Sequence, residues 1–494
     1  MHPLHTMTIL MLATLAAYLL ILGIVSFCNR SAKDNDAFFR AERKAPWAMV
    51  ALGMVGASIS GVSLVSVPGW VASTGMTYLQ MCMGFVAGYL VVAFVLLPLY
   101  YRLRLTSIYA YLGERFGMRT RRTGALFFFL SKLTGASARL YLSVFVIAQF
   151  AHFQNAEVVL SVAVLIIIYL YTRARGLSTI VRTDALQTVC LVLAMVGILW
   201  AAIDALGTDL VGAWGMIVES PMSRVFEWDV VSKQAFWRQF LSGVFIVVVM
   251  TGLDQDMMQK NLSCRTLRDA QKNMCSYGLA FLPVNALLLA LGILLYALLA
   301  ARGLSLEGHP DALLPKLVAD GALGRWVVVP FTIGIAAAAL SSADSALTAL
   351  TTSFCIDILR IEERGMPRQR AERLRRITHI AMLAGVFLCM MIIRIAGTPN
   401  MIDTIYRMAS YTYGPLLGLY AFGMTTRRPV RDGWVPVVCL VVPVACALLD
   451  IYSPQLFGYS FGYELLLVSG ALTMLMLRLL LPPTGSNPSP ARSR

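Results

Sequence analysis

The amino-acid sequence predicts an all-helical membrane protein that crosses the bilayer many times. Of its 494 residues, 58% are hydrophobic and only 14% are charged, and the mean hydropathy is +0.72. So few charges cannot cover the surface of a water-soluble protein of this length. The apolar residues form separate runs of roughly 18 to 25 residues, which suit helices crossing about 30 Å of hydrocarbon, whereas a β-barrel would show alternation over ~10 residues. Soluble enzymes, disordered proteins and single-span receptors are therefore excluded.

Charged residues, proline and glycine divide these runs into about thirteen spans. We expect the spans near residues 7–27, 47–72, 77–99, 124–150, 156–171, 183–205, 236–256, 273–300, 326–358, 377–395, 400–423, 434–450 and 461–481. The first run is longer than the hydrophobic segment of a signal peptide, so we interpret it as a retained span.

Lysine and arginine occur in alternate loops, which fixes the expected orientation. The loop after the seventh span holds Lys260, Arg265, Arg268 and Lys272, whereas residues 151–156 contain no lysine or arginine. Because basic loops stay in the cytoplasm, we expect the N-terminus outside and the C-terminus inside a cell inner (plasma) membrane, surrounded by lipid. The same bias accounts for the net charge of +15, so no nucleic-acid partner is predicted.

Two spans contain helix-breaking residues at corresponding places. The second span has glycines at 53, 56 and 61 and is expected to end at Pro68 and Gly69, and the seventh has Gly252 beside Asp254 and Asp256. Both spans should unwind near mid-membrane. Their separation is typical of transporters with two five-helix repeats of opposite orientation, although glycines also serve close helix packing.

This pattern divides the chain into five expected parts. They are a first helix and cytoplasmic loop (1–46), a first five-helix repeat (47–205), an extracellular loop (206–235), a second five-helix repeat (236–423), and two extra helices with a cytoplasmic tail (424–494).

The ninth span carries an unusual group of polar residues. Ala338, Ser341, Ser342 and Ser345 are three or four residues apart, so a freed Ala338 carbonyl and the hydroxyls can face one point. Such oxygens suit an alkali cation. Asp344 lies on the same turn, and an ionised acid at this depth costs about 2.5–3.5 kcal/mol unless it faces a partner, water or an ion. The alternative is that the hydroxyls bond to carbonyls one turn back and serve helix packing.

Further charged residues lie within or beside other spans. Arg139 lies inside an apolar run, and a buried arginine can bind a carboxylate with two hydrogen bonds, although it can also pair with an acid such as Asp254. Asp184, at the inner end of the sixth span, can pair with Arg182 or Arg175, or bind an ion. Asp254 and Asp256 are two positions apart, so on a helix they should point to different sides, which does not suit acid–base catalysis. We therefore expect no enzyme.

Four segments together resemble the solute:sodium symporter family, whose sugar, proline, sialic acid and vitamin carriers share a LeuT-like fold. They are FFRAERKAPWAMVALGMVGASISGVS, YTRARGLSTIVRTDALQTV, GLDQDMMQKNLSCRTLRDAQK and ALSSADSALTALTTSFCIDI, in the family's order. The resemblance covers roughly residues 35–425. It implies two inverted five-helix repeats with flanking helices, and sodium-coupled import of a small organic solute by alternating access, carried out by a monomer.

The resemblance also implies sodium sites. The main site would use the carbonyls of Gly56, Ile59 and Ala338 and the hydroxyls of Ser341 and Ser342. A second sodium would lie between Asp184, Ser341, Asp344 and Ser345. This chain has Asp344 where the family pattern has a serine, which could strengthen ion binding or hold a proton, so the ion count is left open.

The solute contacts implied by the resemblance are Ser60, Ser63, Gln80, Arg139 and Asp254. The Glu-Gln pair of the sugar carriers is absent, which argues against a galactose-like solute. A sialic acid carrier of the family uses an arginine on the helix that carries Arg139, so we expect an anionic solute, a carboxylate or an acidic sugar such as sialic acid. The alternatives are a proton-coupled carrier on the same scaffold, with Asp344 or Asp184 carrying the proton, and a transporter-like sensor.

Overall fold

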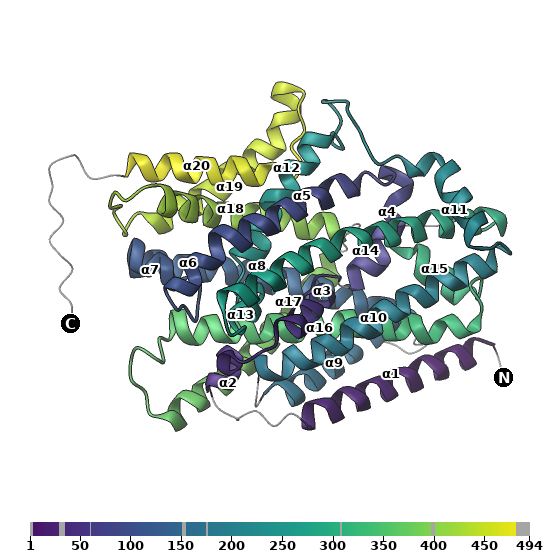
Figure 1. Ribbon diagram of the computed structural model, residues 1–494, viewed down its shortest axis with the longest axis horizontal. Helices are drawn as coiled ribbons and strands as arrows, with labels where there is room; N and C mark the ends of the chain where they lie inside the picture. Colours follow the sequence, from purple (N-terminus) through teal and green to yellow (C-terminus); the bar gives the residue numbers. More distant parts are fainter. Residues whose placement is uncertain are drawn as a thin grey trace.

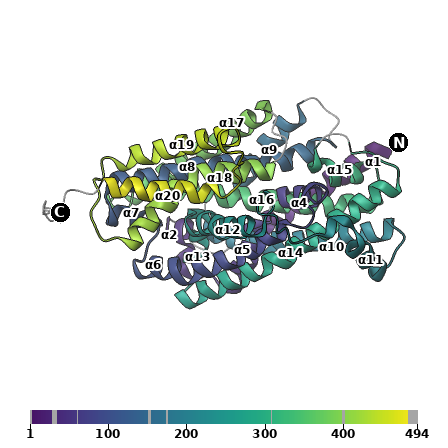
Figure 2. The same cartoon turned by 90° about the horizontal axis from the view of Figure 1, so that it is seen from above.

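The computed structural model describes residues 3–28, 35–59, 61–150, 155–173, 176–306, 309–396 and 401–480. Its helices run mostly along one axis (Figure 1). The start of α1 and the end of α20 lie at opposite ends of this axis in both Figure 1 and Figure 2. Within the described ranges, β-structure is limited to one bridge between Ala45 and Cys264.

The helices of the bundle have the following bounds. They are α1 (Pro3–Phe27), α2 (Asn35–Arg40), α3 (Trp47–Ser58), α4 (Gly61–Thr74), α5 (Tyr78–Val91), α6 (Leu97–Arg102), α7 (Ala110–Arg115), α8 (Met118–Ala148), α9 (Ala156–Thr172), α10 (Leu177–Ala205), α11 (Leu210–Glu219), α12 (Phe236–Val247), α13 (Gln255–Leu262), α14 (Leu267–Ala301), α15 (Leu313–Ala319), α16 (Val328–Ser353), α17 (Arg368–Ala396), α18 (Met401–Thr425), α19 (Val435–Phe457) and α20 (Leu465–Leu479). Turns of π-helix follow α5 (Val92–Leu96), α12 (Val248–Gly252) and α16 (Phe354–Ile358), and short 3-10 turns lie at Ala41–Arg43, Pro221–Ser223, Pro310–Ala312 and Arg325–Val327.

Several helices are longer than the spans that the sequence predicts, because the predicted spans cover only their apolar part. The helix α8 begins at Met118, although its apolar run begins near residue 124, and α17 begins at Arg368 rather than near residue 377. Apolar length detects only the part of a helix that lies in hydrocarbon, so charged turns at its ends escape it. The expected loop 206–235 contains a helix of its own, α11.

Apolar side chains cover both the inside and the outside of the bundle. The central helix α16 is buried along nearly its whole length, from Phe331 to Ser353. Peripheral helices instead expose large apolar residues, among them Leu20, Leu388 and Leu440. An apolar exterior around a buried centre is the arrangement of a protein surrounded by lipid. In the described residues, seven helices are long and apolar enough to cross a membrane, and the two bent pairs raise this number to nine.

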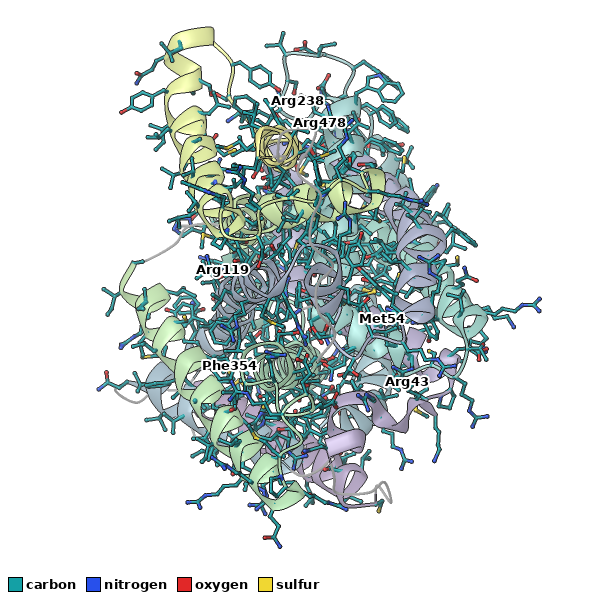
Figure 3. All side chains as sticks on the ribbon, turned by 90° about the vertical axis from the view of Figure 1, so that its left-hand side faces the viewer. Arg43, Met54, Arg119, Arg238, Phe354 and Arg478 are labelled. Carbon is teal, nitrogen blue, oxygen red and sulfur yellow. The ribbon has the colours of Figure 1, made fainter. Side chains whose placement is uncertain are left out.

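The two expected breaks are confirmed as bends. The helices α3 and α4 meet at 54°, and α12 with its π-turn meets α13 at 65°. The backbone N–H of Ala45, just before α3, donates to the carbonyl of Ser263, just after α13, so α3 begins where α13 ends and the two bent pairs run in opposite directions. The bundle is seen along its axis in Figure 3, where several helices appear end on around Phe354 and Arg119.

The position of the first break differs from the sequence expectation. The helix α3 continues through Gly53 and Gly56, and α4 continues through Pro68 and Gly69 to Thr74. Glycine lowers helix stability only modestly. At Gly69 the missing side chain lets α4 approach the backbone of Pro310, because a Cβ there would lie 2.2 Å from the Pro310 carbonyl oxygen. The expected end of the span at Pro68 and Gly69 is therefore wrong.

Candidate functional site

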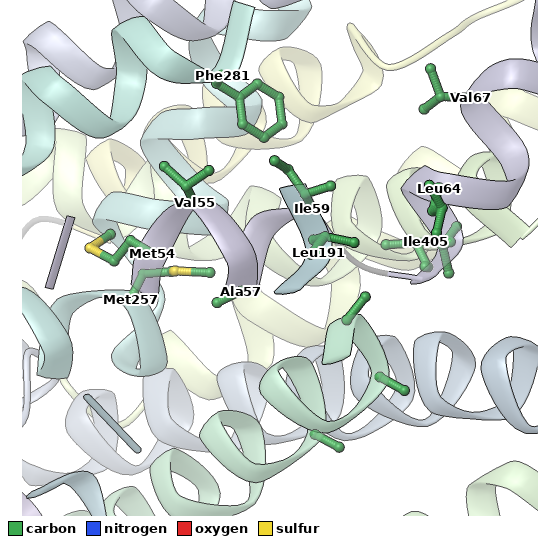
Figure 4. Packing of buried hydrophobic residues seen from close by; sticks show 14 of the residues in the cluster. Met54, Val55, Ala57, Ile59, Leu64, Val67, Leu191, Met257, Phe281 and Ile405 are labelled. Carbon is green, nitrogen blue, oxygen red and sulfur yellow. The ribbon is translucent and has the colours of Figure 1, made fainter. Parts of the chain in front are cut away.

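The end of α3 touches α10 closely because two of its residues have no side chain. A Cβ on Gly56 would lie 2.0 Å from Thr188 Oγ1, and one on Gly53 would lie 2.9 Å from Asp184 Cβ. The same turn of α3 also contacts α16, where the Ser342 hydroxyl donates to the Ala57 carbonyl at 3.3 Å. Figure 4 shows this turn, from Met54 to Ile59, packed among apolar side chains of neighbouring helices.

The residues expected at the main sodium site lie on both sides of this contact. Ile59 ends α3 with a non-helical backbone, and its carbonyl accepts no hydrogen bond from any residue that the structure describes. Gly56 lies one turn earlier. On the other side, α16 is continuous through Ala338, so the expectation of a freed carbonyl is wrong. Because a carbonyl oxygen has two lone pairs, Ala338 can offer an ion only the one outside the helix.

Asp184 is the centre of a buried group of polar side chains. Its Oδ1 accepts a hydrogen bond from the Ser341 hydroxyl at 2.7 Å, and its Oδ2 accepts one from the Ser345 hydroxyl at 3.4 Å. The Lys260 ammonium lies 2.8 Å from the same Oδ2. We call Asp184, Lys260, Ser341 and Ser345 the cation cluster.

Lys260 was missed by the sequence reasoning, which placed it in a cytoplasmic loop. The structure buries it, with 2% of its surface exposed, on α13. Its spacing of four from Asp256 is the one signal in the sequence that could have indicated a buried charged helix face. The expected pairing of Asp184 with Arg182 is replaced by the pair with Lys260.

Asp344 forms its hydrogen bonds with groups other than Asp184. Its Oδ2 accepts from the Tyr171 hydroxyl at 2.7 Å, and its Oδ1 accepts from the backbone N–H of Ser345 at 2.6 Å. Of the four residues expected at a second sodium site, Asp184, Ser341 and Ser345 are therefore joined directly, whereas Asp344 is held by Tyr171 on α9.

Asp254 and Asp256 form a second ionic group with Lys132. The Lys132 ammonium lies 3.2 Å from Asp254 Oδ2 and 2.7 Å from Asp256 Oδ2, and the Tyr413 hydroxyl donates to Asp254 at 2.6 Å. The expectation that the two acids point to different sides is wrong. Asp254 lies before α13 in an extended conformation, so helical spacing does not apply to it.

The expected solute contacts differ in what their polar atoms already bind. Gln80 donates to the carbonyls of Thr77 and Gln234 and accepts from the Glu227 N–H, and Asp254 is paired as described above. By contrast, the side chains of Arg139 and Ser63 are half-buried and form no hydrogen bond or ion pair with the described residues. The expected contact Ser60 lies outside the described residues.

Arg139 lies on α8 near the first break. A Cβ on Gly61, the first residue of α4, would lie 2.4 Å from the Ser143 hydroxyl oxygen, and Ser143 donates to the Arg139 carbonyl one turn back at 3.1 Å. An arginine without an ionic partner among the described residues thus lies one helical turn from the side chain that contacts the start of α4.

Comparison with known proteins gives a consistent result. The family model described as the sodium:solute symporter family matches residues 38–435. The human sodium/iodide cotransporter is 25% identical over 422 residues, covering 81% of this chain and 62% of its own length, so the chain spans less than two thirds of that relative. The sodium/sialic acid symporter of Proteus mirabilis is 22% identical over 495 residues, covering 93% of both chains.

A solved structure shows the same fold. A Na⁺-coupled sialic acid symporter in a substrate-bound outward-open state superposes with a TM-score of 0.82 at 18% identity, covering 95% of this chain and 97% of that one. These proteins are transporters rather than enzymes, and the family model covers most of the chain. The chain belongs to the sodium:solute symporter family.

Proposed function

We propose that the chain imports a small organic anion, a carboxylate or an acidic sugar such as sialic acid, together with sodium by alternating access. In this proposal thirteen helices cross the inner (plasma) membrane, with the N-terminus outside. The segments 47–205 and 236–423 form the two inverted repeats, and the monomer is the functional unit. The opposite directions of the two bent pairs support the repeats.

The unpaired guanidinium of Arg139 is the observation that carries the anionic solute. A charge within a span is costly unless it faces water, a partner or a ligand, and Arg139 has no ionic partner among the described residues. A guanidinium binds a carboxylate through two parallel hydrogen bonds, which a lysine cannot match. The relatives named for iodide and sialic acid both take anions, which also favours this class of solute.

The proposed main sodium site lies between the first break and α16. Its ligands are the carbonyls of Gly56, Ile59 and Ala338 and the hydroxyls of Ser341 and Ser342. The Ile59 carbonyl, without a hydrogen-bond donor among the described residues, supports the site because a cation can supply its missing partner. Sodium bound there fixes the end of α3 against α16, and with it Ser63, one turn into α4.

Sodium can therefore order the solute site before the solute binds. A sodium entering down a tenfold gradient yields about 1.4 kcal/mol. The membrane potential adds about 2.3 kcal/mol per charge at 100 mV, but a monovalent anion moving inward loses the same amount. One sodium could thus concentrate a monoanion only about tenfold at such a gradient, so the number of sodium ions matters for the cell.

Thermal unfolding of the purified protein in sodium chloride and in choline chloride tests this function. Ligands that bind the native state raise the melting temperature. We expect sodium to raise it, and one member of a panel of acidic sugars, monocarboxylates and amino acids to raise it further only in sodium. If sodium has no effect while pH does, the proton-coupled alternative takes its place.

Arg139→Ala and Arg139→Lys test the solute site in the same assay. We expect both variants to keep the sodium response and to lose the response to the anion, since lysine lacks the planar fork. Arg394→Ala is the matched control, because Arg394 pairs with Glu157 on the surface of α17 at 2.8 Å. An unchanged anion response in Arg139→Ala would show that the arginine does not contact the solute.

A further inference from the structure

We propose that Lys260 is a tethered cation that takes the place of a second sodium ion, so that this transporter binds one sodium rather than two. The inference rests on the proposed sodium-coupled function. It concerns the cation cluster of Asp184, Lys260, Ser341 and Ser345, which joins α10, α13 and α16.

The Lys260 ammonium contacts a carboxylate oxygen that a second sodium would need. It lies 2.8 Å from Asp184 Oδ2, while the two serine hydroxyls contact Oδ1 and Oδ2 of the same carboxylate. All four side chains are buried, with at most 2% of their surface exposed. The carboxylate is the one charged ligand in the cluster that could bind sodium there, and a covalently attached positive charge already neutralises it.

Electrostatics disfavours a sodium ion beside the lysine. Two positive charges that share one carboxylate lie a few ångströms apart, and in a buried site water does not screen their repulsion. Sodium could bind there only if the ammonium moved away from Asp184, which would break a buried ion pair. Beyond this ion pair, the ammonium forms no hydrogen bond with the described residues.

The same ion pair prepares the main sodium site. A hydroxyl has one donor and two lone pairs. The Ser341 hydroxyl donates its hydrogen to Asp184, so its lone pairs remain for an ion on the other side. Lys260 therefore has two effects: it fills the second position, and it fixes the carboxylate that orients a ligand of the first.

A tethered cation also changes how the two repeats are coupled. A second sodium would link α10 and α16 only while bound. The Lys260–Asp184 pair joins α13 to α10, and the Ser341 and Ser345 hydroxyls join Asp184 to α16, without any bound ion. The charge balance changes as well. A monoanion that enters with one sodium carries no net charge across the membrane, so its uptake is independent of the membrane potential.

Equilibrium binding of radioactive sodium alone, with no solute present, tests the inference. We expect the wild-type protein to bind one sodium per chain with a Hill coefficient of about 1, since this coefficient cannot exceed the number of sites. Lys260→Ala frees the carboxylate, so we expect two sodium ions per chain. Lys260→Arg keeps the charge, and Lys260→Ala with Asp184→Asn removes the ligand, so each should bind one.

The outcomes separate the inference from the proposed function. Two sodium ions in the wild type, or one in a folded Lys260→Ala variant, would overturn the tethered cation. If Lys260→Ala does not fold, the wild-type protein still tests the inference, because two bound sodium ions there would overturn it. No sodium in the wild type but one in Lys260→Ala would leave the lysine assignment standing and reject the main site. No sodium in either protein would reject both.

Discussion

The two broken helices have a similar geometry but a different chemistry. At the second break, the freed carbonyls of Gly252 and Leu253 accept hydrogen bonds from the Tyr100 and Tyr109 hydroxyls, each at 2.8 Å. The Asp254 carboxylate accepts from two backbone N–H groups at the start of α13. At the first break, the Ile59 carbonyl has no donor among the described residues.

This difference separates a structural break from one that can bind an ion. A break in a membrane helix exposes backbone groups that must find partners, since lipid supplies none. Tyrosines and an aspartate supply those partners at the second break, so it is saturated by the protein itself. At the first break the Ile59 carbonyl has no donor among the described residues, and a cation can supply its missing partner.

The largest expected effect concerns the second break, whose freed carbonyls accept hydrogen bonds from tyrosine hydroxyls. Asp254→Ala removes the N-cap of α13, the partner of Tyr413 and one of the two acids around Lys132. We expect a loss of about 3–5 kcal/mol in stability, as for other broken buried ion pairs. The melting temperature of the purified protein measures it.

Glu372→Ala is the control for that variant. Glu372 accepts from Arg368 at 3.0 Å in a pair that is partly exposed to solvent, so its loss should change stability by about 0–1 kcal/mol. If the two variants melt at the same temperature, the second break does not depend on its ion pairs, and the contrast between the breaks fails.

The next effect tests the close contact at the first break. Gly56→Ala would place a methyl group 2.0 Å from Thr188 Oγ1, so α3 must move away from α10. We expect a loss of about 1–3 kcal/mol, as for other overpacked sites, and a weaker sodium response, because the carbonyls move with the helix. Thermal unfolding at several sodium concentrations measures both effects.

Gly135→Ala supplies the comparison, since no atom lies within 4 Å of the added methyl group. It should preserve stability and the sodium response. A Gly56→Ala variant that behaves like Gly135→Ala would show that the end of α3 can shift without disturbing the carbonyls.

The sequence predicted the parts of the site that depend on local patterns. Glycine content indicated both breaks, and the spacing of Ser341 and Ser342 indicated a polar face on α16. Lys260 could not be found in this way. The helix α13 is polar yet fully buried, so the apolar run ends before it and its charges look like those of a loop. Its partner Asp184 is distant in sequence, and only packing brings the two together.

A similar reason explains the error at Asp254. Helical spacing predicted two divergent acids, but an N-cap residue has an extended backbone and can turn its side chain toward the helix start. Helical spacing applies only up to the residue at which the helix breaks, and glycine content alone did not locate that residue in the seventh span.

Serine variants on α16 test the ion site at a smaller scale. Ser342→Ala removes a proposed ligand beside the Ala57 carbonyl, so we expect the half-saturating sodium concentration to rise about tenfold, or about 1.4 kcal/mol. Ser345→Ala, one turn later, removes a hydroxyl of the cation cluster and should leave the half-saturating sodium concentration unchanged. Equal effects of the two variants on sodium binding would contradict the separation of the main site from the cluster.

The smallest expected effect concerns Tyr277, whose hydroxyl lies between the Ser58 hydroxyl and the Tyr89 hydroxyl beside the first break. Tyr277→Phe keeps the ring but frees Ser58, so we expect sodium binding to weaken by about 0.5–1 kcal/mol, roughly a two- to five-fold change in half-saturation. Tyr296→Phe is the control on the same helix, because the Tyr296 hydroxyl donates to the Gly69 carbonyl, far along α4 from the break. If the sodium response changes equally in both variants, the effect comes from a general loss of stability in α14 and not from the contact with Ser58. A change in Tyr277→Phe alone would show that the first break, unlike the second, is held only weakly by the protein and depends on its ion for order.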